Sequence, residues 1–453
     1  MAPPPLRAIR CDGPHMREGG RAIAWTILRL AAGVLAIAVL AGLAWAFTTD
    51  ARYVLQTAPL RAQASAEPPV LAAGYGSGPI DTAAGWRDER APALREVFAA
   101  EVYGRMPAPA PVRITERRTI DEQAFNGAGR LEELTLVIEA PGGVIETRLA
   151  LVTPAGDDGP APLFLLPNDC GPRFALRRDD LSAPSSPQAP WCRSVEGWTG
   201  ALGRFVFGRY VLNPPAETIL ERGYALAVYH DADFVPDDRA AAGPALARMT
   251  HAAPDHPPGA LAGWAWGVSR LIDALAPLER IDNTRIALMG HSRRGKMALL
   301  AAAHDDRLAV TIAHQSGTMG AALTQNGRGE PVSNLVERYP HWFTPGFSRY
   351  AADPSALPVD QHQLLALAAP RAVLLGGASR DGWSDPTGAL AAAIGADPVW
   401  LLHGEEGVEQ DSLRDWRPAA DIAIHHRPGT HGITAADWAA FLDFADAHLE
   451  ADD

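Results

Sequence analysis

Between residues 82 and 154 the apolar positions recur with the short periods of strands and helices. LEELTLVIEA (131–140) and VIETRLALVTP (144–154) alternate apolar and polar residues on either side of Pro141-Gly142-Gly143. A period of two around a glycine turn predicts an antiparallel hairpin. Upstream, residues 82–107 have the periodicity of an amphipathic helix up to a proline, which predicts a helix ending there.

Further along the chain the pattern changes to short, nearly continuous apolar runs, several of them separated by helical segments. Such runs are typical of parallel strands buried on both faces. Together with the hairpin they predict a doubly wound, mostly parallel α/β sheet with antiparallel N-terminal strands and helices on both faces. The runs are 161–169, 223–231, 284–290, 308–315, 370–378 and 421–428.

The N-terminal region contains an uncharged apolar run, Leu30 to Phe47, whose 18 residues are about the minimum for a bilayer span. The run contains Ala44-Trp45-Ala46, a candidate cleavage pattern, so 1–47 is predicted to be a signal peptide or an uncleaved signal anchor. Basic residues before the run predict that the rest of the chain is exported, to a periplasm or cell surface, with 30–47 as the inner-membrane anchor if uncleaved. These residues are Arg7, Arg10, Arg17, Arg21 and Arg29.

Three segments are therefore expected: the N-terminal segment 1–47, a tether at 48–70, and one α/β domain at 71–453. A formal net charge of −13 argues against nucleic acid as a partner. Three cysteines are too few for a disulfide scaffold or a zinc cluster. In an oxidising compartment Cys170 and Cys192 can pair. No metal-site or phosphate-loop motif is present, so no metal or organic cofactor is expected.

The run at 284–290 ends in a candidate catalytic turn. TRIALMGHSRRGKMALL (284–300) passes from an apolar strand through Gly290-His291-Ser292 into a helix-forming stretch. A serine on a sharp strand-to-helix turn is the nucleophile elbow of α/β-hydrolases. The spacing departs from G-x-S-x-G, because the second glycine, Gly295, comes one residue later. The helix N-terminus favours an oxyanion beside this serine.

A nucleophilic serine needs a histidine base that is oriented by a carboxylate. In this fold the acid and then the histidine follow the serine along the chain. Asp381 comes after the run at 370–378, and His431 comes after the run at 421–428. Asp385 is the alternative acid, four residues on. A merely structural role is the alternative interpretation of His431.

With these residues in view, the chain resembles the glucuronoyl esterases, carbohydrate esterase family 15, and in particular their bacterial members. The resemblance covers nearly all of 80–450. The shared motifs are EVYGR (101–105), WAWGVSRLID (264–273), GHSRRGK (290–296), YPHWF (339–343), LPVDQH (357–362), DGWSDP (381–386) and THGITAADW (430–438).

The resemblance implies a serine esterase that cleaves the ester between 4-O-methyl-glucuronic acid on xylan and lignin alcohols. Ser292 would be the nucleophile and His431 the base. Arg293 would bind the oxyanion, Lys296 would bind sugar hydroxyls, and Glu330 and Trp383 would contact the glucuronate ring. Fungal members carry a catalytic Glu after the strand that follows the elbow, where this chain has Gln315. The acid role therefore falls to Asp381.

Alternatives remain for the individual residues and for the function. Arg293 and Lys296 could be solvated helix residues, and Trp383 could belong to the core. The activity could be directed at another carbohydrate ester, acetyl or simple uronate. A third alternative is a membrane-tethered carbohydrate-binding protein without turnover, which only Gln315 supports. The sequence gives no indication of oligomeric state, alcohol moiety or polymer length.

Overall fold

The computed structural model describes residues 1, 16–48, 65–156, 159–188, 192, 209–250 and 255–449. Two compact units are present, Met1–Thr57 and Ala58–Asp453. The first contains helix α1 (Met16–Thr48), in which Trp25–Ala44 is long and apolar enough to cross a membrane. A signal sequence has the same property, so both N-terminal alternatives fit. Most of the expected tether, 49–64, lies outside the described residues, and the three segment boundaries remain predictions.

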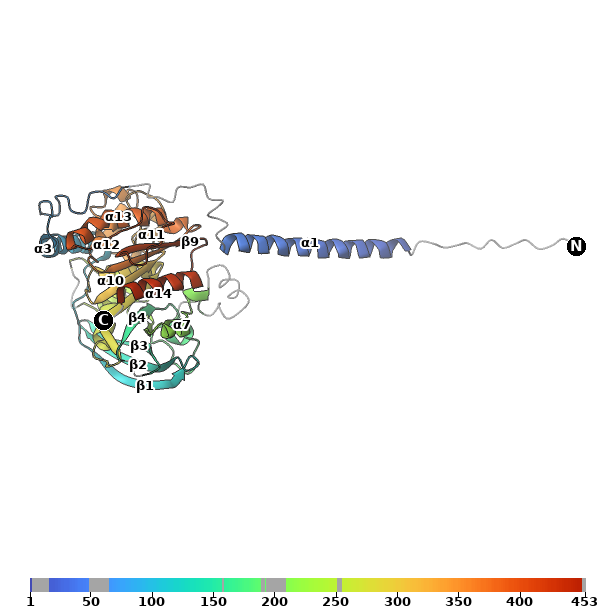
Figure 1. Ribbon diagram of the computed structural model, residues 1–453, viewed down its shortest axis with the longest axis horizontal. Coiled ribbons are helices and arrows are strands. Elements are labelled where there is room, and N and C mark those ends of the chain that lie inside the picture. Colours follow the sequence, from blue (N-terminus) through green and yellow to red (C-terminus); the bar gives the residue numbers. More distant parts are fainter. Residues whose placement is uncertain are drawn as a thin grey trace. The chain divides into compact units, whose positions relative to one another are not determined.

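The second unit is built on one sheet, whose described strands follow the order β1-β2-β3-β5-β4-β6-β7-β8-β9. Figure 1 shows β1, β2 and β3 at the lower end of this unit. Pairing is antiparallel from β1 to β5 and parallel from β5 through β4 to β9. The predicted α/β fold and its antiparallel start are confirmed. The strands are β1 (Val112–Ala124), β2 (Gly129–Ala140), β3 (Gly143–Pro154), β4 (Ala161–Pro167), β5 (Ala225–Tyr229), β6 (Ile281–His291), β7 (Leu308–His314), β8 (Ala372–Ala378) and β9 (Ile422–Arg427).

Over the parallel strands β4 to β9 both faces of the sheet are largely buried, which explains the continuous apolar runs. In β6, Ile286 and Leu288 belong to one core, whereas Ala287 and Met289 belong to the other. The first core includes α9 (Ala260–Leu275), α10 (Arg293–Ala302) and α13 (Pro386–His403), and the second includes α7 (Ala216–Glu221) and α14 (Ala435–Leu449). Further α-helices among the described residues are α5 (Pro172–Ala175), α8 (Ala242–Ala247), α11 (Val332–Arg338) and α12 (Gln361–Ala366).

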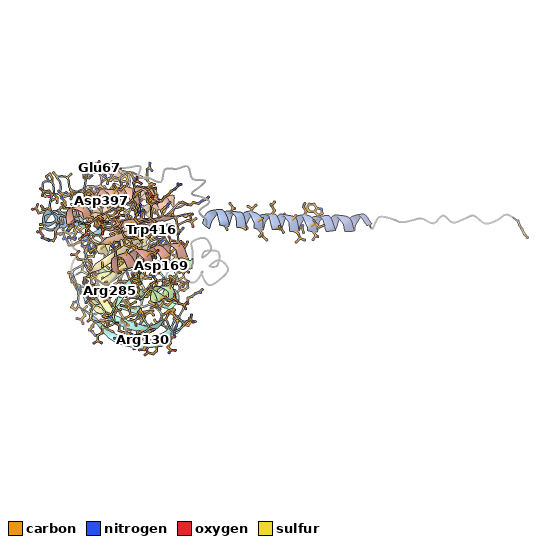
Figure 2. The ribbon with its side chains drawn as sticks, in the orientation of Figure 1. Glu67, Arg130, Asp169, Arg285, Asp397 and Trp416 are labelled. Atoms are coloured by element: carbon orange, nitrogen blue, oxygen red, sulfur yellow. A yellow bond between two sulfur atoms is a disulfide. The ribbon has the colours of Figure 1, made fainter. Side chains whose placement is uncertain are left out.

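Strand β1 was not anticipated, because its sequence is mostly polar and its residues are mostly exposed. Its pairing with β2 is supported by ion pairs between the strands, Arg117 with Glu132 at 2.7 Å and Arg118 with Glu133 at 2.6 Å. Figure 2 shows Arg130, on β2, at this outer end of the unit. Charges on an edge strand discourage pairing with another chain.

The helix predicted at 82–107 ends earlier than expected. Helical turns run through α3 (Ala83–Gly85), η1 (Trp86–Arg90), α4 (Ala91–Phe98) and η2 (Ala99–Tyr103). Gly104 then takes a φ of 80°, and a Cβ there would lie 2.1 Å from the carbonyl oxygen of Pro257. The glycine, rather than the later proline, therefore ends the helix.

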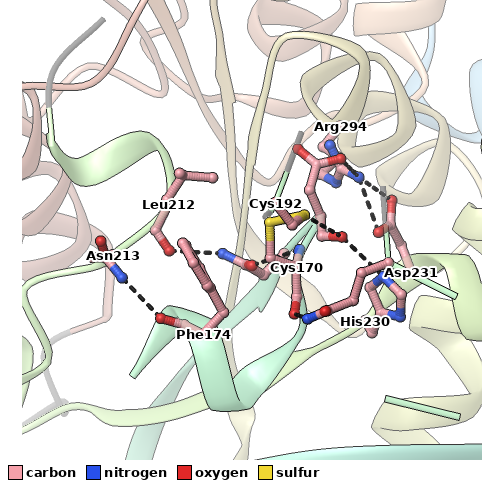
Figure 3. The surroundings of a disulfide bond; sticks show 11 residues. Cys170, Phe174, Cys192, Leu212, Asn213, His230, Asp231 and Arg294 are labelled. Atoms are coloured by element: carbon pink, nitrogen blue, oxygen red, sulfur yellow. Dashed lines mark hydrogen bonds and ion pairs between the residues drawn. A yellow bond between two sulfur atoms is a disulfide. The ribbon is translucent and has the colours of Figure 1, made fainter. Parts of the chain in front are cut away.

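A disulfide joins Cys170, in the loop after β4, to Cys192 (Figure 3). Both cysteines are buried and pack against Leu212. Asn168 holds the same loop, because its Nδ2 donates to the Leu212 carbonyl at 2.8 Å and its Oδ1 accepts from Cys170 N–H at 3.0 Å. The loop that follows β4 is thus fixed covalently and by hydrogen bonds.

Replacing both cysteines by serine is expected to lower stability without removing the catalytic groups. The disulfide spans 22 residues, for which the loss of chain-closure constraint corresponds to about 3 kcal/mol. Denaturant unfolding of the double variant and of the wild-type chain, with and without reductant, measures this difference. A free energy of unfolding that reductant leaves unchanged in the wild-type chain would contradict the expectation.

Candidate active site

Ser292 lies between the end of β6 and the start of α10, with φ 57° and ψ −125°. Its backbone N–H donates to the carbonyl of His314, on β7, at 2.9 Å. A non-glycine residue at positive φ is strained, and such strain is concentrated at functional sites. The predicted strand, turn and helix are all present around this serine.

Close packing explains the two glycines of the motif and their spacing. A Cβ on Gly290 would lie 2.0 Å from the carbonyl oxygen of Arg294, and one on Gly295 would lie 2.9 Å from the Cβ of Ser316. Gly290 lets the strand pass directly under the first turn of α10. Gly295 lets the helix approach the loop after β7, which is why the second glycine stands at this position.

His431 and Asp381 meet beside this turn. His431 Nδ1 lies 2.8 Å from Asp381 Oδ2 and 3.3 Å from the Ser384 hydroxyl. Its ring lies 4.7 Å, centroid to centroid, from that of His291, the neighbour of Ser292. Burial acts to raise the pKa of Asp381, but the hydrogen bond and charge of His431, with Ser384, hold it below its usual value. An ionised Asp381 accepts the Nδ1 proton, so Nε2 of His431 is the free base.

Asp385, the alternative acid, has a different set of partners. Its Oδ1 accepts from Gly388 N–H at 3.0 Å and from the Thr387 hydroxyl at 2.7 Å. With φ 40° and Pro386 next, it is the N-cap of α13. The structure therefore brings Asp381, and not Asp385, into contact with His431.

Arg293, the first residue of α10, is ion-paired rather than solvated. Its guanidinium contacts Asp237 and lies over the rings of Tyr339 and Trp342, 5.4 and 5.2 Å from their centroids. Asp237 also accepts from Trp342 Nε1 at 2.7 Å and lies 2.9 Å from His341 Nε2. Asp237 and the motif YPHWF (339–343) thus fix the position of the Arg293 guanidinium. The sequence did not point to Asp237, because this residue follows no strand directly.

The charges around Asp237 favour the ionised form of its carboxyl group. Burial acts to raise the pKa of Asp237, but the hydrogen bond from His341 and the charge of Arg293 lower it far below its usual value. Arg293 therefore keeps a carboxylate partner below the pH at which an ordinary aspartate becomes protonated. A guanidinium held on one side presents its remaining N–H groups in a fixed direction.

Arg294 plays a different part from its neighbour. It is buried and pairs with Asp169, after β4, at 2.5 Å and with Asp231, after β5, at 2.8 Å (Figure 3). Burial opposes its charge, and the two carboxylates overcome this and raise the pKa of Arg294. The arginine ties the start of α10 to the ends of β4, which lies beside β6, and of β5, the next strand in the sheet. Two acids at the ends of adjacent parallel strands were the signal for this contact in the sequence.

Lys296 is only 4% exposed, and its Nζ donates to the carbonyls of Ser316 at 2.6 Å and Thr318 at 2.5 Å. It is therefore no solvated helix residue. Burial lowers the pKa of Lys296 to about 8, against the opposing charges of Glu330 and Asp381 and with the help of Arg293. All of these charged groups accordingly lie within electrostatic reach of Lys296.

Glu330 and Trp383 adjoin each other on two loops. The backbone N–H of Glu330 donates to the carbonyl of Trp383 at 2.9 Å, and Glu330 Oε1 accepts from Asn334 at 2.5 Å. The Trp383 side chain is 52% exposed, so it is not part of the core. Its flat face is open to a ligand. Among the described residues no group of His, Cys, Asp and Glu is arranged to hold a metal ion.

Comparison with known proteins identifies the family. A family model described as "Glucuronyl esterase, fungi" matches residues 238–404. The carbohydrate esterase MZ0003, from an unknown prokaryotic organism, is 31% identical over 384 residues, which are 82% of this chain and 87% of that protein. The chain belongs to carbohydrate esterase family 15, the glucuronoyl esterases.

Solved structures of this family match over most of the chain. A promiscuous family 15 esterase from a marine bacterial metagenome has a TM-score of 0.73 and 28% identity, covering 86% of this chain and 98% of that one. The glucuronoyl esterase from Solibacter usitatus has a TM-score of 0.70 and 30% identity, covering 86% and 99%. The predicted family, the α/β-hydrolase fold and the class of carboxylic ester hydrolase are confirmed.

Proposed function

We propose that this family 15 esterase hydrolyses glucuronoyl esters of the xylan–lignin type through an acyl-enzyme on Ser292. The observation that carries the proposal is the 2.8 Å contact between His431 Nδ1 and Asp381 Oδ2 beside the strand-to-helix turn. Family membership supports the substrate class, and this contact supports the mechanism. The proposal treats Ser292, His431 and Asp381 as one catalytic unit.

In the first half of the reaction, the Ser292 hydroxyl attacks the uronoyl carbonyl carbon while its proton passes to His431 Nε2. Asp381 holds the imidazole and stabilises its positive charge. Arg293 and the backbone N–H groups at the start of α10 stabilise the oxyanion. The intermediate then expels the alcohol, which takes the proton from His431, and the uronoyl group stays on Ser292.

In the second half, a water molecule gives its proton to His431 and attacks the acyl-enzyme. Collapse of the second intermediate returns that proton to Ser292 and releases the uronic acid. The ester substrate carries no charge on its acid group until it is cleaved. Cations beside the carbonyl therefore act mainly on the transition state, where negative charge develops.

Recognition of the sugar is assigned to Lys296, Glu330 and Trp383. Trp383 offers an exposed flat face for the ring, and Glu330 lies beside it. Two of the Lys296 donors are used on backbone carbonyls. One ammonium hydrogen is left for a substrate hydroxyl, since an ammonium group has three.

A panel of esters tests the substrate class. Methyl and benzyl esters of glucuronic acid should be hydrolysed with a higher kcat/KM than acetylated sugars of similar size. Comparison of the methyl with the benzyl ester reports on the alcohol side. Preferred turnover of the acetyl esters would assign the enzyme to another carbohydrate ester and would end the uronoyl proposal.

Replacing Asp237 by alanine is expected to lower kcat by about ten- to a hundredfold, because Arg293 would lose its fixed direction and with it part of an oxyanion interaction. KM should change less. Asp282→Ala is the matched control, since Asp282 pairs with Arg285 at 2.7 Å within β6 at the other end of the strand. Steady-state kinetics of the two variants would contradict the role of Asp237 if both lost activity equally.

The N-terminal segment bears on where this reaction takes place. We propose that the α/β domain acts outside the cytoplasm, in the periplasm or at the cell surface. If the N-terminal segment is not cleaved, α1 anchors this domain to the inner membrane. The apolar span Trp25–Ala44 supports this proposal. A carbohydrate polymer is too large to enter the cytoplasm uncut, which agrees with export.

A further inference from the structure

Gln315 lies directly after β7, next to His314, and is only 2% exposed. Its backbone has a φ of 49°, and its N–H donates to the carbonyl of Gly376, on β8, at 2.9 Å. The side chain is thereby fixed at the carboxyl edge of the sheet. Its amide points toward the loop that carries His431.

The Gln315 amide contacts the two peptide groups that flank His431. Its Nε2 donates to the carbonyl of Thr430 at 3.2 Å, and its Oε1 accepts from the N–H of Gly432 at 2.7 Å. A neutral side chain with both a donor and an acceptor in one plane is provided by an amide. Gln315 thus pairs with the loop as a neighbouring strand would.

We infer that Gln315 is a positioning residue, whose amide fixes the backbone on both sides of His431 and so aims the imidazole at Ser292. This inference rests on the proposed function, in which His431 is the base. It also gives position 315 a role that needs no negative charge. In this arrangement Asp381 supplies the charge that stabilises the imidazolium.

The other contacts of the loop do not replace this pairing. Arg427 donates to the Gly432 carbonyl at 2.5 Å, and His314 Nε2 lies 3.0 Å from the same oxygen. These contacts fix the residue after His431. Thr430, the residue before His431, receives only a long contact from Arg427, whose guanidinium lies 3.4 Å from the Thr430 carbonyl oxygen. A third of the His431 side chain is exposed, so packing alone does not hold the ring.

Replacement by leucine, which has a similar size and no polar atoms, tests the inference. We expect Gln315→Leu to lower kcat by about ten- to a hundredfold, because a displacement of about 1 Å in a catalytic group can cost a hundredfold. KM should stay within about twofold, because the substrate contacts are elsewhere. Kinetics on a methyl or benzyl glucuronoyl ester measures both quantities.

The chain offers a matched control in Gln410, which is also buried. Its Nε2 donates to the Ile424 carbonyl at 3.0 Å, and its Oε1 accepts from the Ile424 N–H at 2.6 Å. Gln410 therefore makes the same kind of backbone pairing within β9. Gln410→Leu should lower the melting temperature about as much as Gln315→Leu does, and should leave kcat within about twofold of wild type.

A glutamate at position 315 adds a readout that a merely structural role would not move. A neutral carboxyl offers an O–H donor and a carbonyl acceptor, as an amide does, whereas a carboxylate offers acceptors only. The ratio of kcat for Gln315→Glu to kcat for wild type should therefore fall as pH rises. The titratable and charged groups on the elements around position 315 are His291 on β6, Lys296 on α10, His314 on β7, Asp381 after β8, His425, Arg427 and His431 on and after β9, and Asp437 on α14.

Two outcomes would overturn the inference. One is a Gln315→Leu variant that melts like Gln410→Leu and keeps kcat within twofold of wild type. The other is a Gln315→Glu ratio that rises with pH, which would mean that a second carboxylate assists the imidazolium. If Ser292→Ala and His431→Ala also kept their activity, the proposed function would fail first. If Ser292→Ala and His431→Ala lose activity while Gln315→Leu keeps it, the proposed function stands and only the role inferred for Gln315 fails.

Discussion

Ser292→Ala is expected to lose at least about a thousandfold in kcat, because it removes the only atom that forms the acyl-enzyme. The residual rate would come from the oxyanion donors and from substrate binding. The variant should fold, since alanine takes the place of serine at φ 57° without adding an atom. Hydrolysis of a glucuronoyl ester, with the melting temperature as the check on folding, measures the effect.

The same experiment decides against the alternative of a carbohydrate-binding protein without turnover. If the hydrolysis measured with the wild-type chain came from some other source, Ser292→Ala would leave it unchanged. An enzyme with this nucleophile would instead show a burst of alcohol release equal to the enzyme concentration, when deacylation is the slow step. The alanine variant should show neither the burst nor the steady turnover.

Asp381→Asn has the second largest expected effect, a fall in kcat of about a thousand- to ten-thousandfold. The amide NH₂ can turn toward His431 and stabilise the wrong tautomer, with the proton on Nε2. It also removes the charge that stabilises the imidazolium. The 2.8 Å contact with His431 Nδ1 is the structural reason for both effects.

Asp385→Asn is the matched control for this second prediction. Asparagine caps helices about as well as aspartate and accepts left-handed backbone angles. The cap of α13 at φ 40° should therefore survive, and kcat should stay within about threefold of wild type. A larger loss in Asp385→Asn than in Asp381→Asn would exchange the roles that we propose for the two acids.

The fold was largely predictable because burial on both faces leaves a direct trace in the sequence. Each of the strands β4 to β9 coincides with an apolar run, and the glycine turn marks the β2–β3 hairpin. Strand β1 left no such trace. Its Arg117 and Arg118 are held by ion pairs to the neighbouring strand. In the sequence alone, a charged stretch of this kind is equally typical of a solvated loop.

The candidate site was predictable where it follows strand order, and less so where it depends on contacts across loops. Both Asp381 and Asp385 follow β8, and sequence order alone does not separate them. The Asp385-Pro386 pair is a helix-start signal that argues for a cap. The carboxylate partner of Arg293 and the Gly432 partner of Gln315 come from loops more than fifty residues away in the chain, and no local pattern specifies such pairs.

The buried link between positions 170 and 192 has a practical bearing on how the enzyme is made. A bacterial cytoplasm keeps thiols reduced, so protein produced there would start without the link, whereas secreted protein would carry it. Preparations from the two kinds of host would then be chemically different molecules of identical sequence. Heat-tolerance data gathered on one should not be transferred to the other until the thiol content of each has been titrated.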